Sequence, residues 1–183
     1  MRIDLAIRAW IVLHRVQGLS AALWALSAIG GFGILWMLIA AGLTIAKRLP
    51  PRVFIQLALV LAVTSTINDG VLQRFVGRER PFVALEDVPV IGNRPTSGSF
   101  PSGHTANAFA SAVVLSCFAA GPAWLWWFLA GAIAYSRVYL GVHYPSDVVA
   151  GAFVGIMCAF ATIAATRRRI VCPSRPRPRG RSR

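Results

Sequence analysis

Charged side chains are scarce in this chain. Asp, Glu, Lys and Arg together make up 14% of its 183 residues, whereas a soluble domain carries roughly 25%. Hydrophobic residues make up 56%, and the mean hydropathy is +0.62. Four long windows carry no charge: residues 21–46, 53–67, 105–136 and 148–166. This composition argues against a soluble protein and indicates a membrane protein.

The uncharged windows are long enough to cross a bilayer as helices. About 20 apolar residues span the hydrocarbon core, and segments this long without alternation exclude barrel strands. We therefore predict an all-α fold, a polytopic membrane helix bundle with about five transmembrane helices. They are expected near residues 21–46, 53–75, 104–120, 123–142 and 146–166.

Cysteine is also rare, and its three positions form no pattern. Cys117 and Cys158 fall inside predicted spans, and Cys172 lies near the C-terminus. The odd number and the spacing predict neither a disulfide framework nor a metal site, so we interpret them as small apolar fillers. An internal repeat is absent too. Gly151 and Gly155, in the last span, have a spacing typical of closely packed membrane helices.

The two ends of the chain differ from its apolar centre. In residues 1–20 charged side chains are interleaved with aliphatic ones and Trp10, which predicts an amphipathic helix in the membrane interface. A signal peptide is the weaker alternative, because the charges are scattered. Residues 167–183 are rich in Arg and Pro, which predicts a disordered tail. The membrane domain is expected over residues 21–166.

Lysine is almost absent: the net charge is +13, and Lys47 is the one basic residue that is not Arg. If the helices alternate, the basic linker 47–52 and the tail share one side of the membrane. The positive-inside bias makes that side cytoplasmic. A basic tail beside a membrane contacts anionic headgroups more often than nucleic acid. We therefore expect membrane lipids and no nucleic acid as partners, and the polar motifs on the periplasmic or extracellular face of the cell membrane.

Residues suited to hold a phosphate lie at the ends of the apolar segments. Arg80 and its neighbour Pro81 precede a loop, and Pro101-Ser102-Gly103-His104 opens a span. Backbone N–H groups at a helix start favour an anion, Gly103 lets the backbone approach it closely, and the Ser102 hydroxyl adds a hydrogen bond. An ordinary N-cap explains Ser102 equally well, but it does not explain His104.

A further polar cluster strengthens the case for catalysis. Ser136 and Arg137 close one span, and His143 and Asp147 follow at the start of the next. Four residues apart, the carboxylate can hold one imidazole nitrogen and leave the other free to attack. For Asp147 alone a plain helix cap is the preferred interpretation. Several polar residues at one membrane face nevertheless indicate function, because such residues are costly there.

In this order, the three polar clusters resemble the signature motifs of the type-2 phosphatidic acid phosphatase superfamily. That superfamily includes membrane lipid phosphatases, bacterial undecaprenyl-diphosphate phosphatases and vanadium haloperoxidases. The resemblance covers about residues 68–151 and implies a metal-independent phosphatase without a cofactor. It implies that His143 is the nucleophile and forms a phosphohistidine, that Asp147 orients it, and that His104 protonates the leaving lipid oxygen and then activates water. The phosphate-binding residues implied are Arg80, Ser102, Gly103 and Arg137.

One position departs from the family pattern. The first motif begins with Lys seven residues before Arg80, where this chain has Gln73. We count Gln73 as a further phosphate-binding residue, because its amide still donates a hydrogen bond, although without charge. Arg74 points about 100° away on a helix, and Arg78 is another candidate for the missing charge. Asp69, one turn earlier, either balances one of these arginines or caps the polar end of the helix.

These features together predict a hydrolase that acts on phosphoric monoester or diphosphate lipids. Undecaprenyl diphosphate is the first choice of substrate, by analogy with similarly short relatives. Phosphatidic acid, phosphatidylglycerol phosphate and lipid A phosphate are the alternatives, and the loop 82–100 is expected to shape the headgroup pocket. A non-catalytic protein that binds or transports a lipid phosphate is the alternative from another class, since it needs no nucleophile.

Overall fold

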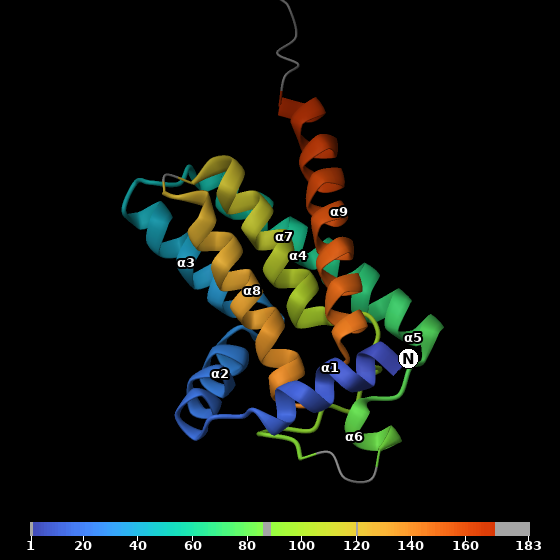
Figure 1. Cartoon of the computed structure of the whole chain (residues 1–183). Helices are drawn as coiled ribbons and strands as arrows, with labels where there is room; N and C mark the ends of the chain where they lie inside the picture. Colours follow the sequence, from blue (N-terminus) through green and yellow to red (C-terminus); the bar gives the residue numbers. More distant parts are fainter. Residues whose placement is uncertain (1, 86–88, 120, 171–183) are drawn as a thin grey trace, which may run out of the picture.

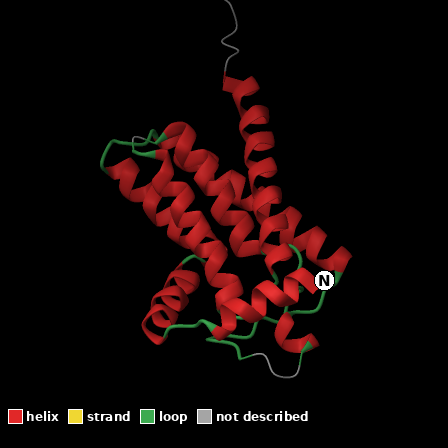
Figure 2. Cartoon of the chain, in the orientation of Figure 1, coloured by secondary structure: helices red, strands yellow, loops and turns green. Residues whose placement is uncertain are grey.

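The computed structural model describes residues 2–85, 89–119 and 121–170, and this part of the chain is helical without a strand (Figure 2). The all-α prediction is therefore confirmed there. The elements are α1 (Arg2–Leu13), α2 (Gln17–Ile29), the 3₁₀ helix η1 (Gly31–Gly33), α3 (Ile34–Ile45), α4 (Pro51–Ser65), the π-helix η2 (Thr66–Leu72), α5 (Gln73–Val76), α6 (Pro81–Ala84), α7 (Gly103–Phe118), α8 (Ala123–Tyr139) and α9 (Pro145–Ile170).

Helix α7 lies at the centre of the bundle. It packs against α4, α8 and α9, and ten of its sixteen residues are buried. Small residues permit the closest approach, as the sequence predicts: a Cβ atom on Gly155 would overlap the Ala106 carbonyl oxygen, and one on Gly151 would overlap that of Ser102. The first turns of α7 and α9 are thus held side by side, which matters because both carry predicted site residues.

The predicted single helix over residues 21–46 is wrong. Two helices, α2 and α3, meet there at an angle of 73°, with η1 between them. Gly33 adopts a left-handed conformation with φ +78°, which L-residues with a side chain rarely tolerate. A Cβ atom at this position would also lie 2.9 Å from Leu61 Cδ1 on α4. Backbone geometry and packing together therefore favour glycine at this position in the break.

Two segments of the described chain are long and apolar enough to span a membrane: Pro51–Ala84 and Pro145–Thr166. The bent pair α2–α3 would make a third span if it acts as one. Helices α7 and α8, with 16 and 17 residues, are about 24–26 Å long at 1.5 Å per residue, slightly short of the hydrocarbon core. The count of five spans stays a prediction.

The two ends of the bundle differ in their surroundings. Figure 1 shows α1 crossing the ends of α8 and α9, near α6, whereas the α3–α4 linker and the C-terminal end of α9 lie at the opposite end. Within the amphipathic segment predicted over residues 1–20, α1 ends at Leu13 and α2 begins at Gln17. Within the tail predicted over residues 167–183, helix α9 continues to Ile170. The rest of the predicted tail, 171–183, lies outside the described residues.

Candidate active site

Six of the eight predicted site residues meet in one cavity of about 1100 Å³, and Ser102 and Asp147 lie outside its lining. It is lined by η2, α5 and α6 with their connection, by the loop 94–98, by the ends of α7 and α8, and by the turn between α8 and α9. His104, His143, Arg80, Arg137, Gly103 and Gln73 all line it. The four segments that carry these residues are separated by up to 70 positions in the sequence (Gln73 to His143), and the bundle brings them to one end.

His143 lies between a cation and a carboxylate. Its Nε2 is 3.1 Å from Arg80 Nη1, and its Nδ1 is 3.5 Å from Asp147 Oδ2. A guanidinium only donates hydrogen bonds, so Nε2 accepts and Nδ1 carries the proton that faces Asp147. The Nδ1 contact is longer than a normal hydrogen bond, as is common for catalytic contacts before substrate binds.

Burial keeps the His143 imidazole neutral. The side chain is 2% exposed, and this desolvation lowers its pKa to about 4. The contact with Asp147 opposes the shift, whereas the charges of Arg80 and Arg137 add to it. Without substrate, the Nε2 lone pair accepts from Arg80, so this neutral imidazole becomes a nucleophile when a phosphoryl oxygen replaces Nε2 as the acceptor of that arginine N–H.

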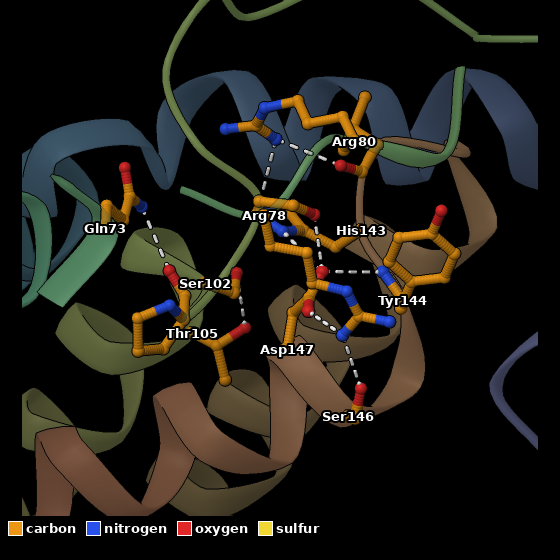
Figure 3. Close-up of polar contacts among 12 residues, drawn as sticks. Gln73, Arg78, Arg80, Ser102, Thr105, His143, Tyr144, Ser146 and Asp147 are labelled. Atoms are coloured by element: carbon orange, nitrogen blue, oxygen red, sulfur yellow. Dashed lines mark hydrogen bonds and ion pairs between the residues drawn. The ribbon is translucent and has the colours of Figure 1, made fainter. Parts of the chain in front are cut away.

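Asp147 is fully buried in the first turn of α9 and is held by three donors (Figure 3). Its Oδ2 accepts from Ser99 Oγ at 2.5 Å and from the Tyr144 backbone N–H at 2.9 Å, and its Oδ1 accepts from Arg78 Nη1 at 2.6 Å. These bonds set the orientation of the carboxylate, so that its Oδ2 faces Nδ1 of His143 and not Nε2.

Arg80 is buried and fixed by backbone oxygens. Its Nε donates to the Ser97 carbonyl at 2.8 Å, and its Nη1 donates to the Val142 carbonyl at 2.9 Å. The remaining nitrogen, Nη2, reaches the Ser97 hydroxyl at 3.1 Å. Because the guanidinium lies beside His143 Nε2, it is placed to hold an oxygen of a phosphoryl group that this atom attacks.

Arg137 and His104 also line the cavity. Arg137, on α8, donates to the Ser27 hydroxyl of α2, and its buried Nε has no hydrogen-bond partner in the described part of the chain. An unpaired buried donor is costly unless a ligand satisfies it. His104, on α7, lies against η1: a Cβ atom on Gly31 would be 3.4 Å from its Nε2. The α2–η1 segment therefore backs both residues.

The remaining predicted phosphate-binding residues differ in their exposure to the cavity. Gly103 lines it, and a Cβ atom there would lie 2.5 Å from Asp69 Oδ1. The Ser102 hydroxyl is fully buried and accepts a hydrogen bond from Thr105 at 3.1 Å, while its backbone N–H donates to the Asp147 carbonyl at 3.0 Å. Ser102 thus joins α7 to α9 and does not line the cavity.

Gln73 also points toward the α7 entry. Its amide nitrogen donates to the Pro101 carbonyl at 2.9 Å, and Asn68 donates to the same oxygen at 3.2 Å. Asp69 accepts from Asn68 at 2.8 Å. Of the two arginines near position 73, Arg78 is already paired with carboxylates, whereas Arg74 is exposed at the cavity.

Four residues around the site were not predicted: Ser97, Ser99, Arg78 in its role beside Asp147, and Asp4. The two serines lie in a loop without periodicity, so no local signal marks them. Asp4 reaches the site from α1, 143 positions before Asp147 in the sequence, where it pairs with Arg78 at 2.9 Å. Within the described residues no group of three or more His, Cys, Asp or Glu side chains could hold a metal ion.

Comparison with known proteins agrees with this arrangement of residues. The model of the PAP2 superfamily matches residues 53–170, which is well over half of the chain. The chain belongs to the PAP2 superfamily. The match includes every predicted site residue, from Gln73 to Asp147.

Individual relatives of this PAP2 protein carry different names. It is 33% identical over 108 residues to the bacitracin transport permease protein BcrC of Bacillus licheniformis, covering 59% of this chain and 53% of that protein. It is 34% identical over 134 residues to the undecaprenyl-diphosphatase of Sulfolobus acidocaldarius, covering 70% and 62%. The chain thus spans about half to two thirds of the length of these relatives.

A solved structure supports the fold. The crystal structure of Aquifex aeolicus LpxE matches with a TM-score of 0.75 and 29% sequence identity, over 88% of this chain and 95% of that one. The helical arrangement described above is therefore shared by a protein of known structure.

Proposed function

We propose that this protein is a metal-independent lipid phosphatase that works through a phosphohistidine. The observation that carries the proposal is His143, whose neutral Nε2 faces an arginine-lined cavity while Asp147 backs Nδ1. Membership of the PAP2 superfamily and a relative named as a diphosphatase support it.

The reaction divides into two steps. In the first, the negative charge of the bound phosphate draws a proton from solvent onto His104. His143 Nε2 then forms a bond to phosphorus, the bond from phosphorus to the lipid oxygen breaks, and His104 gives that oxygen its proton. In the second, His104 takes a proton from water, whose oxygen attacks the phosphohistidine and releases phosphate and His143. Arg80 and Arg137 hold the phosphoryl oxygens in both steps and stabilise the charge that develops.

Undecaprenyl diphosphate remains our first choice of substrate. The cavity holds more arginine than one phosphoryl group requires: Arg74 and Arg94 line it in addition to Arg80 and Arg137. A second phosphate on the leaving side would use this additional charge. Phosphatidic acid, phosphatidylglycerol phosphate and lipid A phosphate each present fewer charges at the reacting end, and they are the alternatives.

We place the enzyme in the cell membrane, the inner membrane of a two-membrane cell, with the site on the periplasmic or extracellular face. The basic α3–α4 linker and the Arg-rich end of α9 lie at the end of the bundle opposite to the site (Figure 1). The positive-inside bias assigns the basic end to the cytoplasm.

The deciding experiment measures phosphate release from a panel of lipid phosphates by the purified protein in detergent with EDTA present. His143→Ala is expected to abolish release, and His14→Ala, at an exposed His outside the cavity, serves as the matched control and is expected to retain it. Hydrolysis by His143→Ala near the parental rate would contradict the mechanism. Loss of the parental activity in EDTA, restored by Mg²⁺, would contradict metal independence.

A second candidate is a lipid-phosphate binding or transport protein without catalysis. The relative named as a bacitracin transport permease favours it. It predicts that parent and His143→Ala bind a lipid diphosphate equally and that neither releases phosphate. The same panel, combined with a binding measurement, separates the two functions.

A further inference from the structure

Arg78 holds two carboxylates that come from opposite ends of the chain. Its Nη1 is 2.6 Å from Asp147 Oδ1, and its Nη2 is 2.9 Å from Asp4 Oδ2. Its guanidinium also lies over the Tyr144 ring, 4.0 Å from the ring centroid. The planar group is therefore stacked on one face and directed at a different acid by each of its two terminal nitrogens.

Asp4 contacts the catalytic helix a second time through Ser146. Its Oδ1 accepts from the Ser146 backbone N–H at 2.9 Å, and its Oδ2 accepts from the Ser146 hydroxyl at 2.6 Å. Burial raises the pKa of the Asp4 carboxyl, but the bonds from Ser146 and Arg78 outweigh it and hold the pKa below its ordinary value. Helix α1 is thus bound, through one ionised side chain, to the residue that precedes Asp147.

The pairing of Asp4 with Arg78 decides how Arg78 binds Asp147. Arginine and a carboxylate tend to pair in a bidentate fork, with both carboxylate oxygens engaged. Asp4 holds Nη2, and Nη1 divides its two N–H groups between the Ser146 hydroxyl at 2.8 Å and Asp147 Oδ1 at 2.6 Å. Arg78 thus binds Asp147 through a single nitrogen. Oδ2 is left to Ser99, the Tyr144 N–H and His143 Nδ1. Without Asp4, the fork is free to close on both oxygens and draw Oδ2 away from the imidazole.

We propose that Asp4 is a positioning residue of the phosphatase, which acts through Arg78 to keep Asp147 directed at His143, so that docking of α1 completes the active site. This inference rests on the proposed function. Asp4 lies outside residues 53–170, the part of the chain that matches the family model.

A double-mutant cycle tests the route through Arg78. Asp4→Asn keeps the size of the side chain and removes its charge, and we expect it to lower kcat about tenfold with KM within about twofold of the parent. In the Arg78→Gln background the same change is expected to have no further effect, because its intermediary is gone. A merely structural role of Asp4 predicts equal losses in both backgrounds. Arg2→Gln, a one-charge change at an exposed position of the same helix, is the matched control.

Three results would overturn the inference: parental kcat in Asp4→Asn, an undiminished effect in the Arg78→Gln background, or an equal loss in Arg2→Gln. If Asp4→Asn lowers the unfolding temperature, its loss of kcat could come from the destabilised fold. Asp4→Glu then separates the two causes, because it keeps the charge. It is expected to retain at least half of the parental kcat, and a kcat as low as that of Asp4→Asn would also contradict the inference. A parent that releases no phosphate refutes the proposed function instead, which keeps the two failures distinct.

Discussion

The protonation of His143 is the residue-level property on which the mechanism depends most. Its pKa is lowered to about 4 in the fold, from the ordinary value of 6.5, so we expect a neutral imidazole at pH 5. The protonation of His143 can be measured by NMR between pH 7 and pH 4 on protein in micelles that carries isotope-labelled histidine. The signal that is missing from His143→Ala belongs to this residue. An imidazole that titrates near pH 6.5 would contradict the burial argument.

The same shift affects stability with a definite sign. Between pH 6.5 and about 4 the unfolded chain binds a proton at His143 that the folded chain does not. The contribution of this residue to the free energy of unfolding therefore falls as the pH is lowered through that window. His143→Ala should unfold with a weaker pH dependence there than the parent.

Gln73 offers a gain of function at a single position. Its amide nitrogen donates to the Pro101 carbonyl, and a Lys ammonium can keep that bond while two further donors face the cavity. A charge-assisted hydrogen bond contributes about 1.5–3 kcal/mol, so Gln73→Lys should raise kcat/KM about tenfold, most for a diphosphate. Gln73→Met, of similar length without a donor, should lower it. Unchanged kinetics in both variants would show that position 73 does not serve the substrate.

Sequence motifs predicted most of the chemistry but not its support. Four side chains that line the cavity could be predicted because each belongs to a short motif at a helix end: His104, His143, Arg80 and Arg137. Ser102 was predicted as a phosphate ligand from its N-cap position, but its hydroxyl is turned to Thr105. Thr105 lies three residues further along the same helix, whereas the Ser102 backbone N–H is held by the Asp147 carbonyl of α9. This second contact joins segments far apart in the sequence, and no local pattern of residues encodes it.

At the scale of elements, the contact between α7 and α9 is the most sensitive to side-chain size. A Cβ atom on Gly155 would overlap the Ala106 carbonyl, so Gly155→Ala must push the two helices apart. We expect it to destabilise the fold by about 1–3 kcal/mol and to lower activity. Gly131→Ala on α8 is the matched control, because nothing lies within 4 Å of its Cβ position. Equal unfolding temperatures for the two variants in detergent would contradict the packing argument.

Uncharged windows predicted where helices lie but not where they bend. The window 21–46 contains no charge, and its apolar character continues through the break at η1. At the bend, Gly33 lies close against Leu61, a residue of another helix. Hydropathy measures affinity for lipid along one segment, so it cannot report a contact between two segments.

At the scale of the whole molecule, the direction of the bundle in the membrane can be measured. In a cysteine-free background, Asn93→Cys lies in an exposed loop beside the cavity and Arg48→Cys lies in the basic linker. We expect a membrane-impermeant thiol reagent to label the first but not the second in intact cells, or in spheroplasts where an outer membrane blocks entry. The reverse pattern would turn the site toward the cytoplasm and favour a cytoplasmic lipid.

The close contact of α7 with α9 also determines which parts of the protein can yield to a lipid. Neither helix can slide past the other without forcing a side chain into backbone, so His104 and His143 form walls of fixed separation. Helix α2 is tied to the site from outside the cavity: its Ser27 accepts from Arg137, and its Trp24 packs against Gly92 so closely that a Cβ atom there would overlap the indole. A change in the loop around Gly92 would therefore be transmitted through α2 to an arginine of the cavity. The loop and the phosphate-binding side chains are parts of one mechanical unit.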